Sequence, residues 1–153
     1  PKADMAILEL TPKQFLIEKK YLEGRFLPSF YFNDKLVAVS RDIQLTVLGF
    51  PLGLGAQAYF SPLTYRTYAS SGLITLNRFD NGIPCEFLIL ENPSIGGYSG
   101  GPVIDLSVFT VGAMTTYGEG TTCHGIVHGT ISDETGGKLA AITPSSFLFD
   151  LLK

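Results

Sequence analysis

A glycine-rich run, GGYSGGP at residues 96–102, holds one serine between two glycine pairs. Glycine adopts backbone conformations closed to residues with a Cβ and lets another chain approach closely. A turn of this kind can hold Ser99 outward while the amides of Gly97 and Ser99 converge on one point, as in an oxyanion hole beside a nucleophile. The run therefore predicts a nucleophilic serine. The alternative interpretation is a tight turn with an incidental serine.

The string GGYSGGPV at residues 96–103 resembles the nucleophile motif of trypsin-like serine proteases, whose core is Gly-x-Ser-Gly-Gly-Pro. The segment ADMAIL at residues 3–8 resembles the one that carries the aspartate of their catalytic triad. The resemblance implies that Ser99 is the nucleophile, that Asp4 orients the base, and that Gly97 and Ser99 supply the oxyanion amides. For Asp4 the alternative interpretation is an ordinary exposed aspartate.

The histidine of the triad lies, in this family, in the first of two barrels and before the aspartate. His124 and His128 are the only histidines of the chain, and both follow Ser99. In the family order neither is the base, so we expect the base outside this chain. We interpret both as histidines of the surface or the core edge. The alternative is that they rim the specificity pocket, where a histidine could bind an acidic side chain.

Three further segments are similar to parts of HtrA-like and other bacterial trypsin-like proteases. VLGFPLGLG at 47–55 resembles the Gly-x-Pro-x-Gly segment that opens their second barrel, and ASSGLIT at 69–75 resembles their Gly-Ile-Val-Ser strand. GAMTTYGEG at 112–120 resembles the strand that lines the primary pocket and pairs with substrate. The last similarity implies substrate contacts by Thr115, Thr116 and Tyr117.

Two positions of this resemblance concern substrate specificity. Tyr98 stands where digestive trypsin-like enzymes have the aspartate that pairs with a newly freed amino terminus, so activation by that ion pair is not expected. Pro93 stands six residues before Ser99, where trypsin keeps an acidic residue. We therefore expect Pro93 and Tyr98 to contribute to a neutral substrate pocket, with no preference for lysine or arginine.

The sequence predicts an all-β fold, an antiparallel trypsin-like β-barrel with a short C-terminal helix. Residues 1–10 are expected to form the terminal strand of a first barrel, with MAILEL at 5–10 buried, and residues 11–42 an inter-barrel connection with a helical turn at 13–21. Residues 43–153 are expected to form the second barrel, and the hydroxyl-rich TPSS at 143–146 to cap the final helix. The expected strands are Ile43–Phe50, Tyr65–Arg78, Cys85–Glu91, Val103–Leu106, Thr110–Tyr117, Gly125–Ile131 and Leu139–Ile142.

Composition narrows the classes of function. The 153 residues are 45% apolar and 16% charged, which indicates a globular chain. A formal charge of −3 gives no general attraction to nucleic acid, and the cations between Lys13 and Arg25 are interrupted by acids. No apolar run is long enough to predict a membrane span, and no cluster has metal-ligand spacing. We expect no cofactor. Pairing of Cys85 with Cys123 stays open.

Three functional hypotheses follow. The favoured one is a serine endopeptidase present as a fragment, whose partners are a peptide or protein substrate and a missing N-terminal barrel. Its rival is a protease-fold module that binds peptides without cutting them. The Gly-x-Ser-x-Gly pattern also fits an α/β-hydrolase elbow, but a helix should follow that serine, and here strand-like residues follow. The compartment is open; the family resemblance alone favours a secreted or periplasmic protein.

Overall fold

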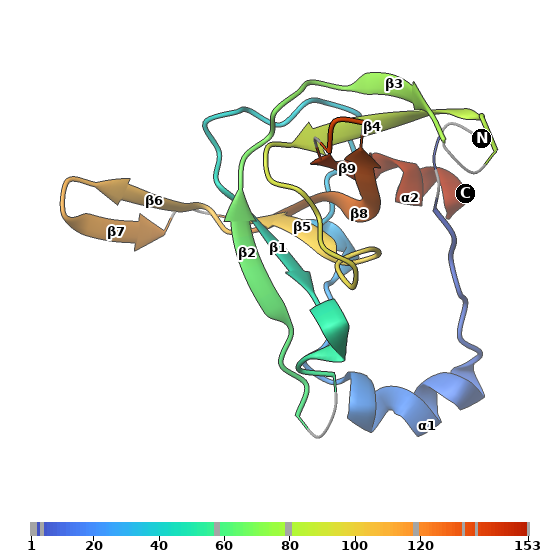
Figure 1. Cartoon of the computed structure of the whole chain (residues 1–153). Coiled ribbons are helices and arrows are strands. Elements are labelled where there is room, and N and C mark those ends of the chain that lie inside the picture. Colours follow the sequence, from blue (N-terminus) through green and yellow to red (C-terminus); the bar gives the residue numbers. More distant parts are fainter. Residues whose placement is uncertain are drawn as a thin grey trace.

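The computed structural model describes residues 3, 5–56, 59–78, 81–117, 120–132, 134–136 and 138–152. These residues form mostly antiparallel β-structure, with a helix near each end (Figure 1). The helices are α1 (Pro12–Leu22) and α2 (Ser146–Leu151), and single 3₁₀ turns lie at Ser29–Tyr31 and Pro51–Gly53. The strands are β1 (Leu45–Gly49), β2 (Leu63–Thr67), β3 (Ile74–Asn77), β4 (Pro84–Leu90), β5 (Pro102–Asp105), β6 (Val108–Val111), β7 (Met114–Tyr117), β8 (Thr122–Ser132) and β9 (Lys138–Pro144).

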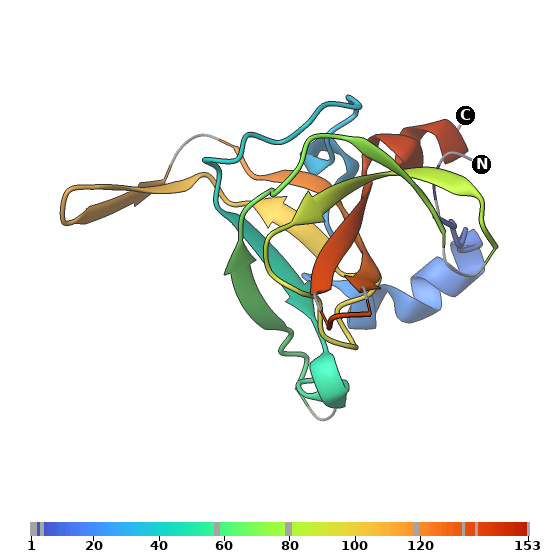
Figure 2. The same cartoon turned by 45° about the horizontal axis from the view of Figure 1, so that its top comes forward.

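Seven strands form one open sheet in the order β2-β1-β5-β8-β9-β4-β3, and every neighbouring pair is antiparallel. The all-β expectation is therefore confirmed. The sheet curves around its core, as the turned view shows (Figure 2). Strands β1 and β8 alternate between two faces, whereas Val103 and Ile104 of β5 are both buried. Val47, Val103 and Val127 are buried in the main core, whereas Leu48 and Ile126 are only half-buried.

Strand β2 and strand β3 replace the single strand expected at residues 65–78. After Thr67 the chain leaves β1 and reaches β4, where the amide of Ser70 donates to the carbonyl of Ile89 (2.7 Å). The amide of Glu91 donates to the carbonyl of Tyr68 (3.1 Å). The chain therefore changes partner strand within the expected element, and the residues of the change are not part of a strand.

Strands β6 and β7 replace the single strand expected at residues 110–117. They form a separate two-stranded hairpin in which Val111 pairs with Met114, and this hairpin extends away from the main sheet (Figure 1). Between them Gly112 has a φ of +61° while Ala113 does not have a positive φ. A glycine of this kind at the first central position is typical of a type II′ hairpin turn. The apolar character of 110–117 predicted strand but not the reversal.

The helix expected near residue 13 is confirmed as α1. Its N-terminus has a capping box, in which the amide of Gln14 donates to Thr11 Oγ1 (3.3 Å) and the Gln14 side chain accepts from the Thr11 amide (3.0 Å). The strand expected at residues 5–10 is absent from the structure: these residues have no regular structure, and Leu8 is 85% exposed. A strand needs a hydrogen-bonded neighbour, and none of the described strands pairs with this segment.

The expected C-terminal helix is confirmed as α2, but its expected hydroxyl cap is wrong. Ser145 is the N-cap residue, and its side chain caps no helical amide. Its hydroxyl instead lies within hydrogen-bond distance of the carbonyl oxygens of Asn33 (2.8 Å) and Cys123 (3.0 Å). Ser145 therefore connects the start of α2 to β8 and to the segment that precedes β1. No helix among the described residues is long and apolar enough to cross a membrane.

Candidate active site

Ser99 lies in the second of two consecutive tight turns. The amide of Tyr98 donates to the carbonyl of Ile95 (3.2 Å), and Gly97 has a φ of +104°. The amide of Gly101 donates to the carbonyl of Tyr98 (2.8 Å), and Gly100 has a φ of +81°. A positive φ at the third residue is the mark of a type II turn. Ser99 is the second residue of the second turn, and it is exposed.

The first turn packs directly on the end of β1. The amide of Phe50 donates to the carbonyl of Gly97 (2.9 Å). A Cβ on Gly97 would lie 2.5 Å from the carbonyl oxygen of Phe50 and 2.6 Å from the Cα of Pro51. Only glycine fits this contact, because any side chain would displace backbone atoms. The sequence segment VLGFPLG at 47–53 thus supplies the support for the turn.

The second turn is bonded to β8. The amide of Gly100 donates to the carbonyl of Val127 (2.7 Å), and the amide of Val127 donates to the carbonyl of Gly101 (2.9 Å). Ser99 is therefore held between β1 on one side and β8 on the other. Both strands belong to the main sheet, so the exposed hydroxyl has a rigid base.

Four amides of the two turns, those of Ile95, Gly96, Gly97 and Ser99, have no acceptor among the described residues. The amide hydrogens of Ile95–Gly101 that donate within the fold belong to Tyr98, Gly100 and Gly101. Those of Gly97 and Ser99 donate to no described group, so they are open to an acceptor on a ligand. The oxyanion role expected for Gly97 and Ser99 stays a prediction.

Tyr98 is a core residue rather than a surface one. Its side chain is 4% exposed and meets the Tyr65 ring edge to face, with the ring centroids 4.8 Å apart. Burial, and secondarily Tyr98, raises the pKa of Tyr65 to about 12. A Cβ on Gly49 would lie 2.5 Å from Tyr98 Cδ1, so the ring packs against bare backbone. Tyr98 anchors the turn in the core, a role that sequence reasoning missed.

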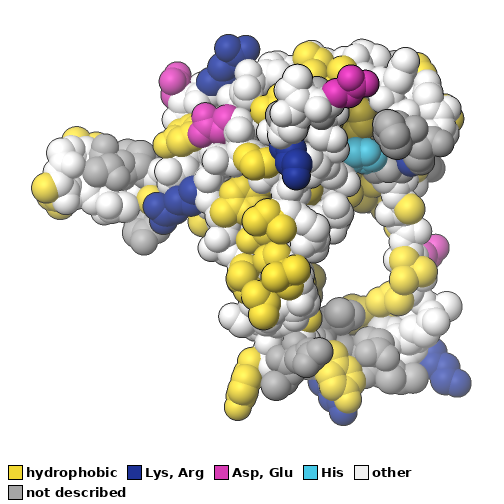
Figure 3. Space-filling view, viewed as in Figure 1, with side chains coloured by type: hydrophobic (Ala, Val, Ile, Leu, Met, Phe, Trp, Pro, Cys, Tyr) yellow, Lys and Arg dark blue, Asp and Glu magenta, His cyan; other side chains and the backbone are white. Residues whose placement is uncertain are grey.

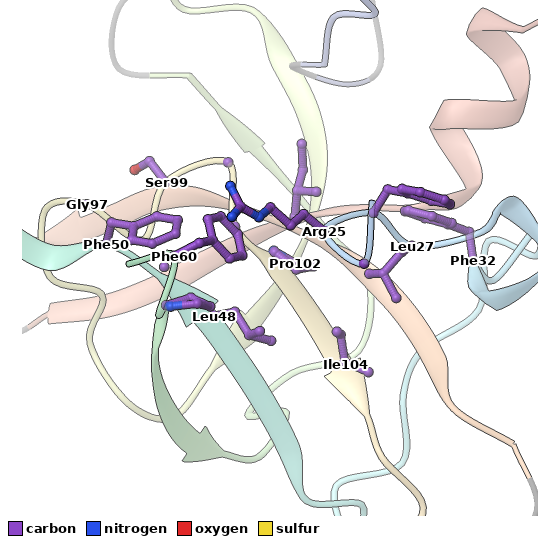
Figure 4. Close-up of a pocket in the computed structure, with 17 residues that line it drawn as sticks. Arg25, Leu27, Phe32, Leu48, Phe50, Phe60, Gly97, Ser99, Pro102 and Ile104 are labelled. Carbon is purple, nitrogen blue, oxygen red and sulfur yellow. The ribbon is translucent and has the colours of Figure 1, made fainter. Parts of the chain in front are cut away.

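Ser99 lines a cavity of about 680 Å³ (Figure 4). Its walls are mostly apolar, and Ser99 lies at one end of the labelled lining residues with its hydroxyl pointing away from them. The guanidinium of Arg25 lies over the Phe60 ring, 4.8 Å from its centroid. The lining residues are Gly24, Arg25, Phe26, Leu27, Phe32, Leu48, Gly49, Phe50, Phe60, Pro62, Gly97, Ser99, Gly100, Gly101, Pro102, Ile104 and Ile126.

The segment at residues 24–32 is the part of this cavity that sequence reasoning missed. It was expected to be a connection only. Its end is bonded to β8, where Phe32 bridges to Cys123 and the amide of Asn33 donates to the carbonyl of Cys123 (2.9 Å). The aromatic cluster between Phe26 and Phe32 was the sequence feature that could have indicated a packed rather than a free segment.

The other expected site residues do not gather around Ser99. Asp4 lies outside the described residues. Pro93 is exposed and does not line the cavity. Thr115 and Thr116 are exposed on β7, in the hairpin that extends away from the sheet, and the side chain of Tyr117 is outside the described part (Figure 1). The strand beside the Ser99 turn is β8, not β7.

Neither histidine lines the cavity that contains Ser99. His128 packs against Phe87, with ring centroids 4.9 Å apart. His124 is half-buried, but both of its ring nitrogens are buried, and neither has a hydrogen-bond partner in the described part of the chain. Burial lowers the pKa of His124 below its ordinary value of 6.5, and the negative charge of Asp105 opposes that shift.

Both cysteines are buried, and no disulfide joins them. Burial raises the pKa of the Cys123 thiol, partly offset by hydrogen bonds with the backbone at Gly125 and Val103. Neither cysteine is among the residues of the Ser99 cavity. Among the described residues, no group of histidine, cysteine, aspartate and glutamate side chains could hold a metal ion.

No protein-family model matches the chain, and neither a curated protein nor a solved structure gives a significant match. The class of protein must therefore be inferred from the geometry around Ser99.

Proposed function

We propose that this chain carries the nucleophile and the oxyanion site of a serine endopeptidase of the trypsin-like type. The observation that carries the proposal is the Ser99 turn itself. An exposed serine hydroxyl is fixed between two strands, next to the unpaired amides of Gly97 and Ser99. A peptide carbonyl whose oxygen accepted from these amides would be polarised toward attack by Ser99 Oγ.

The sheet connectivity supports the trypsin-like barrel. The two edge strands of the open sheet, β2 and β3, follow one another in sequence. The residues between them bond to β4, with Ala69 bridging to Leu90, while β2 bonds to β1. We propose that this connection closes the curved sheet into a barrel, with the Ser99 turn at one end.

In the proposed reaction, Ser99 Oγ forms a bond to the carbonyl carbon of the substrate as a base removes its proton. The base returns that proton to the leaving amine, and water then releases the acyl group by the same steps. Because neither histidine lines the Ser99 cavity, the base would come from a polypeptide segment outside these residues. Asp4 would orient that base, as the resemblance implies.

The substrate strand of this proposal is β8 rather than β7. Strand β5 pairs with β8 only between Thr122 and Ile126. Beyond Val127, which bonds to the Ser99 turn, residues 128–132 have no strand neighbour on that side in the described part of the chain. A peptide can add to such an edge through backbone hydrogen bonds, and its next residues would then lie beside Ser99.

The test is the reactivity of Ser99 toward a fluorophosphonate, located by peptide mass mapping, with added imidazole as an external base. We expect covalent labelling of Ser99 that rises with imidazole concentration and is lost in Ser99→Ala. The exposed Ser40 is an internal reference, because no strained glycine turn surrounds it. Labelling of Ser99 no faster than that of Ser40 would contradict the proposed function.

A second candidate function is peptide binding without cleavage, and the placement of the two histidines favours it. A binding module needs the β8 edge and the cavity but no base. The two functions differ in one measurement. A binding module would bind peptides equally well in Ser99→Ala and show no selective fluorophosphonate labelling, whereas the protease half-site would be labelled at Ser99.

A further inference from the structure

Among the described residues, one cationic group lines the Ser99 cavity. Arg25 is the only charged side chain among the described residues that line it. Its guanidinium lies over the face of Phe60, and none of the described carboxylates forms an ion pair with it. A guanidinium stacked on a ring keeps its edge available, and that edge presents several N–H donors in one plane.

The surrounding charge also favours an anion. The segment from Pro12 to Arg25 holds Lys13, Lys19, Lys20 and Arg25 against two acids, in a chain whose net charge is −3. Helix α1 has no acidic residue in its first turn and two lysines in its last. Arg25 stands three residues after the last residue of this helix, so the segment that leads into the cavity wall carries more cations than acids.

The rest of the cavity suits an apolar group. Phe50 and Phe60 meet edge to face, with ring centroids 5.3 Å apart, and Leu48, Ile104 and Ile126 line the same cavity. Phe60 is 48% exposed, so apolar surface remains uncovered at the opening. Figure 3 shows apolar side chains gathered around β1, β2 and the loop that joins them. A volume of about 680 Å³ is large enough for one or two side chains.

We propose that this cavity binds a peptide that carries an apolar side chain next to a carboxylate, and that Arg25 pairs with the carboxylate. The carboxylate belongs either to an acidic side chain or to a free C-terminus, which share this chemistry. As a statement about substrate class the proposal rests on the proposed function of Ser99. The binding itself needs no bond to Ser99 Oγ.

The experiment compares three dipeptides by NMR titration of the chain: acetyl-Phe-Glu-amide, acetyl-Phe-Gln-amide and acetyl-Phe-Gln with a free C-terminus. At low salt we expect at least one carboxylate peptide to bind about tenfold more tightly than the neutral one, since a charge-assisted pair is added. Which of the two binds tells whether a side chain or a C-terminus supplies the carboxylate. Salt should reduce the difference.

Variants assign the effect to Arg25. The preference should disappear in Arg25→Gln and persist in Arg25→Lys, which keeps the charge. It should also persist in Arg41→Gln, which removes an equal charge from an exposed residue outside the cavity. The preference for carboxylate peptides should also be retained in Ser99→Ala. This result would support the binding proposal whether or not Ser99 performs the proposed reaction. Equal affinity for all three peptides, no binding of any, or an equal loss in Arg41→Gln would overturn the proposal.

Discussion

The carbonyl oxygen of Gly97 accepts the amide hydrogen of Phe50 at 2.9 Å, and the Cα of Gly97 faces the carbonyl oxygen of the same residue. This pair of contacts joins two sequence motifs that lie almost fifty residues apart, the VLGFPLG segment and the serine turn. The geometry of Ser99 therefore depends on backbone contact, in which no side chain takes part.

Gly97→Ala tests that dependence. The substitution adds a Cβ at a φ of +104° and 2.5 Å from the Phe50 oxygen, so we expect a loss of about 2–4 kcal/mol in the free energy of unfolding. Fluorophosphonate labelling of Ser99 should fall as well, because the turn must move. Chemical denaturation and mass mapping measure the two effects.

Gly100→Ala is the matched control. Gly100 also has a positive φ, of +81°, but a Cβ there meets nothing within 4 Å. Only the backbone strain of about 1 kcal/mol is then expected. If the two variants lost equal stability, close packing of Gly97 on Phe50 would not be what holds the turn.

The serine turn was readable from sequence because its glycines are local requirements of two tight turns. The position of the proposed substrate strand could not be predicted from the sequence, because residues 112–120 and 122–132 have equally strand-like composition. Only long-range pairing, in which Val127 bonds to Gly100 and Gly101, decides between them. Similarly, the apolar run at residues 5–10 predicted a buried strand, yet burial needs a neighbour that local pattern does not reveal.

Tyr65→Phe tests the buried phenol. The Tyr65 hydroxyl is buried without a hydrogen-bond partner in the described part of the chain, so its removal relieves a desolvation cost. We expect the free energy of unfolding to stay unchanged or to rise by up to about 1 kcal/mol. A clear loss in urea denaturation would mean that the hydroxyl has a partner after all.

Tyr65 also predicts that the folded chain loses stability at alkaline pH. Its pKa is about 12 in the folded chain against 10.0 for the ordinary side chain, so the unfolded chain releases its proton first as pH rises. The contribution of Tyr65 to the free energy of unfolding is therefore fully present below pH 10.0, and it decreases as the pH rises toward 12. Urea denaturation across this range should show a steeper decrease in wild type than in Tyr65→Phe.

The buried ring nitrogens of His124 predict that the folded chain loses stability at acid pH. Its pKa is lowered in the folded chain, so below pH 6.5 the unfolded chain binds the proton first, and stability decreases as pH falls. His124→Leu should remove this loss. Asp105→Asn should enlarge it, because the carboxylate opposes the lowered pKa and asparagine keeps an acceptor for the Ser107 amide. Unfolding curves between about pH 7 and 5 are the measurement, and identical profiles for all three proteins would contradict this assignment.

Ser145 and Ser146 form a second matched pair. Ser145 Oγ lies close to the carbonyl oxygens of Asn33 and Cys123, whereas the buried Ser146 Oγ has no partner among the described residues. We expect Ser145→Ala to cost about 1–2 kcal/mol and Ser146→Ala to be close to neutral. Amide hydrogen exchange should also rise at Asn33 in Ser145→Ala only, because that bond helps to hold the segment before β1 on β8. Equal effects of the two substitutions would count against this role.

The β6–β7 hairpin supplies the test that separates the two candidate substrate strands. Val111 is 66% exposed and Met114 is 74% exposed, and within the part of the chain that the structure describes no strand of the main sheet pairs with the hairpin. Replacing residues 108–117 with two glycines should leave the unfolding transition and the labelling of Ser99 unchanged. Peptide binding should persist too, because β8 offers the strand edge next to the Ser99 turn. If this variant lost peptide binding while circular dichroism showed an intact fold, the result would favour Thr115–Tyr117 over β8 as the substrate strand.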